Sequence, residues 1–190
     1  MYEIKFWNEE NYNINKHPYM KWAYDNKKWE FVSDYARLDL VYSHGGIYFD
    51  TDCEMIRNPD VLRRFPAFVG FESTEIVTTG LGVGSEKGNP MIGLLLAEYD
   101  KVDITQKDFD MTPCTLRVTY CLKEHGLNCD NTFQVLGNGE LAVLPTEFLC
   151  GIRLYTKKEQ ITERTVSLHH WCGGWGEKTD QAKCVGLAVR

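Results

Sequence analysis

The sequence has 190 residues, of which 43% are hydrophobic and 25% are charged, a composition typical of a globular domain with one sizeable core. It carries 27 acidic against 21 basic residues, a formal net charge of -6, and no run of lysine or arginine, which argues against nucleic acid as a partner. We therefore expect a single domain over residues 1–190. An anionic substrate would need a local cation, for which a metal ion is one source.

The N-terminal segment is charged from its third residue and has no apolar stretch of the kind found in signal peptides. The longest apolar run, at 91–97, is too short to span a bilayer, so any membrane contact should be peripheral. The seven cysteines include no C-x-x-C pair. We interpret them as scattered thiols rather than as disulfides or metal ligands.

Hydrophobic periodicity and turn residues predict the secondary structure in chain order. The first half should contain a strand at 3–7, a helix at 18–29 opened by Pro18, a helix with Ser33 as N-cap and Gly45 as stop, and a strand at 47–49. The second half should contain a strand at 67–73, helices at 89–101 and 112–126, and strands at 141–145 and 164–171. Helices that alternate with short strands predict an α/β fold whose sheet is covered on both faces.

Two aspartates, Asp50 and Asp52, follow the predicted strand at 47–49. In an extended segment the side chains alternate, so both carboxylates point to the same side and repel unless a cation sits beside them. Magnesium and manganese prefer hard oxygen ligands, often a carboxylate or two together with phosphates. A bare D-x-D is most often a solvated turn, but this one ends a buried run, where an unpaired carboxylate is costly.

Asp34 and Arg37 share one face of the preceding helix because they are three residues apart. A surface ion pair would explain these two residues by themselves. Since their helix runs directly into the Asp50 strand, its first turn could also present both side chains to a sugar. Of the paired glycines before the strand, Gly45 can end the helix, and Gly46 can let the backbone approach a ligand closely.

A third motif, "LHHWCGGW", occupies residues 168–175. Adjacent histidines on a strand face opposite sides, so at most one of His169 and His170 can join the acidic pair. A lone histidine is more often a packed core or surface residue than a ligand. The tryptophans and glycines that follow predict a tight loop whose indole N–H could donate to a phosphate oxygen.

Taken together, the segment 31–60, "FVSDYARLDLVYSHGGIYFDTDCEMIRNPD", resembles the D-x-D segment of glycosyltransferase family 32, which includes bacterial capsular-polysaccharide and mannosyltransferase-like enzymes. The serine-aspartate pair, the arginine three residues later, the tyrosine-x-x-glycine-glycine-isoleucine-tyrosine run and both aspartates stand in the family's order. The motifs "KGNP" at 87–90, "TP" at 112–113 and "LHHWCGGW" are similar to its later landmarks.

The resemblance implies a GT-A fold, a Rossmann-like mixed sheet with helices on both faces. It implies retaining transfer of a hexose from a UDP- or GDP-sugar to a saccharide or glycolipid acceptor, in the synthesis of a bacterial surface polysaccharide such as capsule or lipopolysaccharide. The implied location is the cytoplasm, with peripheral contact at the inner face of the membrane.

The resemblance also implies the roles of the site residues. Asp50 and Asp52 would hold a manganese or magnesium ion, Asp52 more directly, while Asp50 also reaches the ribose or the sugar. His169 or His170 would complete the metal shell, and Arg37 would join the two aspartates in catalysis. The implied donor-binding residues are Asp34, Arg37, Gly46, Tyr48, Asp50 and Trp175.

Two departures from the family pattern leave alternatives open. Family members usually start with a further strand of the isoleucine-proline-lysine-isoleucine-isoleucine-histidine kind, and this sequence begins after it; the family's serine before the last tryptophan is Gly174 here. One alternative is therefore a weakened or inactive relative that binds carbohydrate or nucleotide. Another is a haloacid-dehalogenase-like phosphatase with Asp50 as nucleophile and Asp52 as general acid, although Glu54 stands where those enzymes carry threonine or valine.

Overall fold

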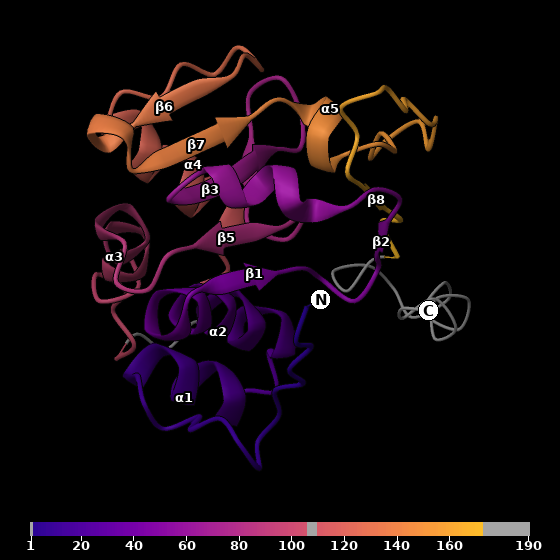
Figure 1. The fold of residues 1–190 in the computed structure, drawn as a ribbon. Coiled ribbons are helices and arrows are strands. Elements are labelled where there is room, and N and C mark those ends of the chain that lie inside the picture. The colour runs from indigo at the N-terminus through magenta and orange to yellow at the C-terminus, as the bar shows by residue number, and fades with distance from the viewer. Residues whose placement is uncertain (1, 106–109, 173–190) are drawn as a thin grey trace.

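The computed structural model describes residues 2–105 and 110–172 (Figure 1). Its helices are α1 (Pro18–Asp25), α2 (Trp29–His44), α3 (Pro90–Ala97), α4 (Cys114–Glu124) and α5 (Thr146–Leu149), with 3-10 helices at Pro59–Arg64 and Gly137–Gly139. Its strands are β1 (Gly46–Tyr48), β2 (Cys53–Met55), β3 (Ala67–Phe71), β4 (Val77–Thr78), β5 (Val83–Ser85), β6 (Gln134–Leu136), β7 (Leu141–Leu144) and β8 (Ser167–His169).

The main sheet runs in the order β1-β5-β3-β7-β6, with β4 beside β3, and it is mixed because β3 pairs parallel with β7 and antiparallel with β5. Successive residues of β3 enter different cores. Val69 packs in the larger core together with residues of α1 to α4, whereas Phe68 packs in a smaller core with Leu149 and Val166. Both faces are therefore covered, and this mixed α/β architecture is compatible with the expected GT-A-like fold.

The helix that leads to the acidic pair begins earlier than predicted. α2 starts at Trp29, and Ser33 is not its N-cap but an interior residue whose hydroxyl donates to the carbonyl of Glu30 at 2.8 Å. The break before α2 comes at Lys27, whose φ is +57°, a local turn that the sequence pattern did not reveal. The predicted stop is confirmed, since Gly45 has φ +73° and its N–H donates to the carbonyl of Val41 at 2.9 Å.

The strand predicted at 3–7 is wrong. These residues are exposed and form no backbone hydrogen bonds with a described strand, so their alternating pattern does not make them part of the sheet. The other predicted elements are present, although β1 begins one residue earlier than predicted and α1 ends at Asp25. The strands that the sequence did not reveal, β2, β4, β5 and β6, have three residues or fewer, too few for a periodicity to appear.

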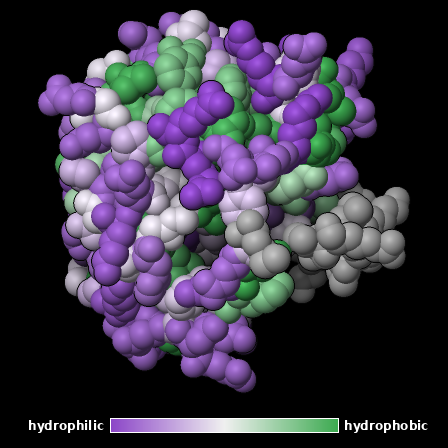
Figure 2. Space-filling view, viewed as in Figure 1, coloured by the Kyte–Doolittle hydropathy of each residue, from purple (hydrophilic) through white to green (hydrophobic). Residues whose placement is uncertain are grey.

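The surface in Figure 2 is largely hydrophilic, with hydrophobic residues gathered in its upper part, over the end of the sheet formed by β6 and β7. Within the described residues, no helix is both long and apolar enough to cross a membrane. Among the residues that the structure describes, five cysteines are free thiols, namely Cys53, Cys114, Cys121, Cys129 and Cys150. Cys172 is disulfide-bonded, so the expectation of thiols throughout is wrong at that position.

Candidate functional site

Arg37 joins the helix α2 to the acidic segment that follows β1. Its Nη2 lies 3.2 Å from Oδ1 of Asp50, and its Nη1 lies 3.4 Å from Oδ2. The same Nη2 lies 3.0 Å from Oδ1 of Asp34, and the Tyr48 hydroxyl donates to Asp50 Oδ1 at 3.0 Å. Asp34 and Arg37 are only 2% and 5% exposed, so they are not a surface ion pair but part of a buried charge network.

The network keeps Arg37 and Asp50 charged. Burial would lower the pKa of Arg37, but Asp50 and Asp34 raise it well above its ordinary value. Burial also acts to raise the pKa of Asp50, yet Arg37 and His169 outweigh it and leave this pKa below its usual value. For Asp34 burial prevails over the opposing effect of Arg37 and raises the pKa to about 6. The charge of Asp50 is thus balanced by the protein, which relieves part of the repulsion from Asp52.

Asp52 lies beside His169, which comes from a strand more than a hundred residues later. The antiparallel pairing of β2 with β8 sets Cys53 opposite His169, and His169 Nε2 lies 3.2 Å from Asp52 Oδ1 and 4.0 Å from Asp50 Oδ2. The other oxygen of Asp52 accepts a hydrogen bond from the backbone N–H of Cys172 at 2.9 Å. The two carboxylates therefore converge on one imidazole rather than splaying apart.

His170 faces away from this group. Its Nε2 lies 2.9 Å from Oε2 of Glu54, and its backbone N–H donates to the carbonyl of Asp52 at 3.0 Å. His169 is 7% exposed and adjoins the acidic pair. Strand alternation thus separates the two histidines as predicted, and it is His169 that adjoins the aspartates.

The donor set can accommodate a divalent ion. Asp52, Cys53 and His169 each offer one ligand atom, and these atoms lie within 4.8 Å of one another. Burial raises the pKa of Cys53, and its Sγ lies 3.6 Å from the carbonyl oxygens of both Gly80 and Leu81, so a thiolate is disfavoured there. The carboxylate of Asp52 and the imidazole of His169 remain. A carboxylate suits magnesium or manganese, whereas an imidazole is a common ligand of transition metals, so the pair can hold a divalent ion without selecting one.

Gly46, one of the predicted donor-binding residues, has a less direct place. Gly46 is exposed at the start of β1 with φ +102°, and a Cβ there would meet no atom within 4 Å, so its backbone conformation explains the glycine. Trp175 and Gly174 lie outside the described residues. The indole of Trp171 donates to the carbonyl of Ile152 at 2.6 Å, which anchors the segment after β8.

Three further residues approach the site without having been predicted. A Cβ at Gly80 would lie 2.6 Å from Asp50 Oδ2 and 3.0 Å from an Arg37 nitrogen, so no side chain fits there. The glycine-rich run at 78–84, "TTGLGVG", was the available signal for such a close approach. Cys114, the first residue of α4, is electrostatically coupled to Asp34 and Arg37, and burial raises its pKa. Burial likewise raises the pKa of Glu72 to about 7, against the effect of His169.

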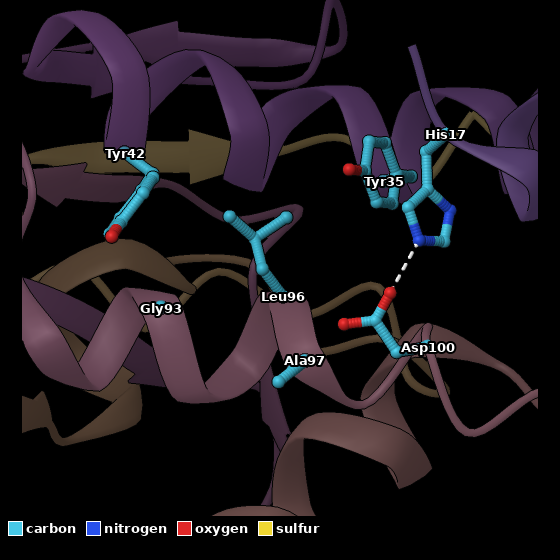
Figure 3. A pocket seen from close by; sticks show the side chains of 7 residues that line it. All are labelled: His17, Tyr35, Tyr42, Gly93, Leu96, Ala97 and Asp100. Atoms are coloured by element: carbon cyan, nitrogen blue, oxygen red, sulfur yellow. Dashed lines mark hydrogen bonds and ion pairs between the residues drawn. The ribbon is translucent and has the colours of Figure 1, made fainter. Parts of the chain in front are cut away.

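Two cavities are lined by residues outside the group formed by Asp50, Asp52 and His169. One, of about 190 Å³, opens between α2 and α3 and is lined by His17, Tyr35, Tyr42, Gly93, Leu96, Ala97 and Asp100 (Figure 3). His17 stacks on Tyr35 there and its Nε2 lies 2.8 Å from Oδ1 of Asp100. The other, of about 590 Å³, is lined by Arg57, Asn58, Val61, Phe148, Glu163, Arg164 and Val166. Neither cavity is lined by the two aspartates or by His169.

Comparison with known proteins points to one family. Residues 1–69 match the family described as "Glycosyltransferase sugar-binding region containing DXD motif". A curated relative, inositol phosphoceramide mannosyltransferase 3 of Schizosaccharomyces pombe, is 28% identical over 95 residues, which cover 48% of this chain and 26% of the relative. The match thus spans about a quarter of that protein's length. No solved structure matches the chain.

The matched residues 1–69 include Asp34, Arg37, Asp50 and Asp52, so the buried charge network lies within the region that defines the family. Over residues 1–69, which hold its D-x-D motif, the chain is similar to this family of sugar-binding glycosyltransferase regions.

Proposed function

We propose that the chain transfers a hexose from a UDP- or GDP-sugar donor to a saccharide or glycolipid acceptor, with retention at the anomeric carbon and with the assistance of manganese or magnesium. The observation that best supports this proposal is the 3.2 Å approach of Asp52 Oδ1 to His169 Nε2 beside the Arg37–Asp50 pair. It places a carboxylate and an imidazole where they can hold a divalent cation, and such a cation can bind the diphosphate of a nucleotide sugar.

Asp52 and His169 would hold the ion, which supplies Lewis-acid stabilisation of the negative charge on a departing diphosphate. Asp34 and Arg37 would bind and orient the donor sugar through groups already fixed by their mutual pairing. Asp50, held by Arg37 and Tyr48, would accept a hydrogen bond from a hydroxyl of the ribose or the sugar. These roles need little rearrangement because the side chains are already ordered by packing.

Retention without an enzyme nucleophile implies attack by the acceptor hydroxyl on the face from which the diphosphate leaves. The new bond forms between the acceptor oxygen and the anomeric carbon as the bond to the phosphate oxygen breaks. The hydroxyl proton passes to the departing phosphate. Asp50 is a poor substitute nucleophile because Arg37 and Tyr48 engage its oxygens and its pKa is lowered. The same pairing argues against the phosphatase alternative, in which Asp50 would attack phosphorus.

The curated relative is named as a mannosyltransferase for inositol phosphoceramide, so mannose is one donor sugar to test. The setting that we propose is synthesis of a bacterial surface polysaccharide, in the cytoplasm and at the inner face of the membrane. Donor binding without transfer would instead support the alternative of an inactive binding protein.

Isothermal titration with UDP-glucose, UDP-galactose and GDP-mannose, with and without manganese chloride, tests the proposal. We expect at least one donor to bind in a manganese-dependent manner and to be hydrolysed slowly when no acceptor is present. Hydrolysis of p-nitrophenyl phosphate would favour the phosphatase alternative. Failure of all donors to bind with manganese would contradict the proposed function.

A further inference from the structure

A lysine from the connection between α5 and β8 reaches the segment that carries His169. This connection, residues 150–166, lies in the orange to yellow part of the chain in Figure 1. Lys157 is exposed there, and its Nζ donates a hydrogen bond to the carbonyl of Trp171 at 3.2 Å. Because Trp171 follows His169 by two residues, this bond brings a cation to the segment beside the acidic pair.

A short series of contacts limits the distance between this lysine and Asp52. The residue after Trp171 is Cys172, whose backbone N–H donates to Asp52 Oδ2 at 2.9 Å. Since only one peptide bond separates the Trp171 carbonyl from that N–H, Lys157 Nζ lies at most about 9 Å from Asp52 Oδ2. An ion on Asp52 and a phosphate bound to that ion would cover a similar span, because a metal–oxygen bond is about 2.1 Å long and a charge-assisted hydrogen bond about 2.8 Å.

The loop around Lys157 is fixed to the same segment by further contacts. The Trp171 indole N–H donates to the carbonyl of Ile152 at 2.6 Å, and the Trp171 ring lies 4.2 Å from the His169 ring, centre to centre. A β-bridge between Ile152 and Glu159 closes the loop. The loop that carries Lys157 is therefore held beside His169 by contacts that do not involve the lysine side chain.

Both residues of the Lys157–Trp171 contact have an unfavourable backbone conformation. Lys157 has φ +52° and Trp171 has φ +53°, in the left-handed region that residues with a side chain rarely adopt. Such conformations cost free energy, persist only where the surrounding structure fixes them, and are concentrated at ligand sites. Two of them in one contact beside the aspartates favour a functional role for this contact.

The charges at the site leave a need for a further cation. Arg37 pairs with both Asp34 and Asp50, so its charge is already balanced within the protein. An ion at Asp52 would be balanced in part by that carboxylate, and a diphosphate adds further negative charge. Lys157 can offset this charge, since among the described residues no carboxylate pairs with its ammonium. An ammonium has three donors on a flexible stem, which suits phosphate oxygens.

We propose that the Lys157 ammonium binds the diphosphate of the nucleotide-sugar donor and stabilises the negative charge that develops there as the bond to the sugar breaks. The ammonium stays protonated, donates hydrogen bonds to phosphate oxygens and takes no part in proton transfer. Trp171 is the positioning residue, because its carbonyl accepts the Lys157 bond and its indole anchors the loop. The identity of the ligand rests on the proposed function, whereas an anion site at Lys157 does not.

Isothermal titration of the whole chain with inorganic pyrophosphate and manganese chloride tests the anion site. We expect Lys157→Gln to weaken pyrophosphate binding about tenfold and Lys157→Arg, which keeps the charge, to retain most of the affinity. Lys158→Gln is the matched control and should leave the affinity unchanged. It removes the same charge from the neighbouring exposed residue, whose side chain contacts no polar group in the part of the chain that the structure describes.

The salt dependence separates a charge effect from a structural one. Because Lys157 is exposed, the difference in pyrophosphate affinity between the wild type and Lys157→Gln should shrink as sodium chloride is raised. A difference that does not change with salt would show that the lysine only holds Trp171 in place, and it would overturn the proposal. Equal pyrophosphate affinity of the wild type and Lys157→Gln, or equal losses in Lys157→Gln and Lys158→Gln, would overturn it as well.

The same titrations with UDP-glucose and GDP-mannose separate this proposal from the proposed function. We expect Lys157→Gln to weaken manganese-dependent binding of the donor about tenfold. If a donor binds equally well to the wild type and to Lys157→Gln, the proposed function stands and the role of Lys157 fails. If pyrophosphate binding depends on Lys157 but neither donor binds, the anion site stands and the proposed function fails. If the wild type binds neither pyrophosphate nor a donor, both fail.

Discussion

Arg37 holds Asp50 by both carboxylate oxygens, with nitrogen–oxygen distances of 3.2 and 3.4 Å, and the arginine side chain is 6% exposed. Because of this pairing, the two aspartates of the D-x-D motif have different roles. Asp50 is neutralised by the protein, and Asp52 is the carboxylate left beside His169. One aspartate therefore belongs to the fixed framework of the site, and the other is the ligand that we assign to the metal.

Replacing Arg37 with methionine should strongly destabilise the fold. The change leaves the buried carboxylate of Asp34 and the partly buried one of Asp50 without their cation, and loss of one partner from a buried charge pair costs about 3–5 kcal/mol. Urea unfolding at neutral pH measures the free energy of unfolding. Arg63→Met is the matched control because Arg63 pairs with Asp60 on the surface, and it should cause no measurable change. Equal effects of the two changes would show that the Arg37 network is not structural.

The stability of the protein should depend on the titration of Asp34. Its pKa is about 6 in the folded state, mainly because of burial, against an ordinary value of 3.8. Between these values the folded state binds more protons than the unfolded state, so this residue's contribution to stability falls as the pH rises. Asp34→Asn removes that dependence. The free energy of unfolding of the variant should therefore rise relative to the wild type between about pH 4 and pH 6, by on the order of 2 kcal/mol. A difference that stays constant in urea titrations across this interval would contradict the assignment.

Adding one methyl group at Gly80 should disturb the site directly. In Gly80→Ala the new Cβ would lie 2.6 Å from Asp50 Oδ2 and 3.0 Å from an Arg37 nitrogen, so the ion pair must shift. We expect donor affinity measured by calorimetry to fall about tenfold or more. Gly88→Ala is the control, because its Cβ meets nothing within 4 Å, and it bears only the strain of φ +75°. Normal donor affinity in Gly80→Ala would mean that the Arg37–Asp50 geometry is not needed for binding.

The two adjacent histidines should behave differently. His169→Asn removes the imidazole that lies 3.2 Å from Asp52, whereas His170→Asn removes a contact with Glu54 away from the acidic pair. Electron paramagnetic resonance of manganese should show affinity weakened about tenfold or more in the first variant and unchanged in the second. Equal manganese affinity in both variants would remove His169 from the proposed metal shell.

The local parts of the site could be predicted from sequence. The approach of Arg37 to Asp50 follows from a helix that stops at Gly45 and a short strand that begins at once, and both were visible as a glycine signal and an apolar run. The closeness of Asp50 and Asp52 was also predicted, but its cause was not, because the segment is a turn at 51–52, in which the Cys53 N–H donates to the Asp50 carbonyl at 3.0 Å, and not the extended strand end that was expected. These features depend on neighbours within about twenty residues.

The long-range parts could not be predicted. The pairing of β2 with β8 brings His169 to Asp52 across more than a hundred residues, and although a strand around β8 was predicted, the three residues of β2 left no periodic signal for its partner. The close approach of Gly80 depends in the same way on how the segment before β5 meets the strand end. The prediction of a strand at 3–7 was wrong because an alternating pattern is not sufficient for a strand, which also needs a partner strand to pair with.

The affinity of the wild type and of Asp52→Asn for GDP-mannose and UDP-glucose, each measured calorimetrically with and without manganese, tests the central claim most directly. If Asp52 and His169 hold an ion that also binds the donor diphosphate, manganese should strengthen binding of at least one donor to the wild type about tenfold or more and should have no such effect on Asp52→Asn. Donor affinity that does not respond to manganese in the wild type, or that responds equally in both proteins, would contradict the account.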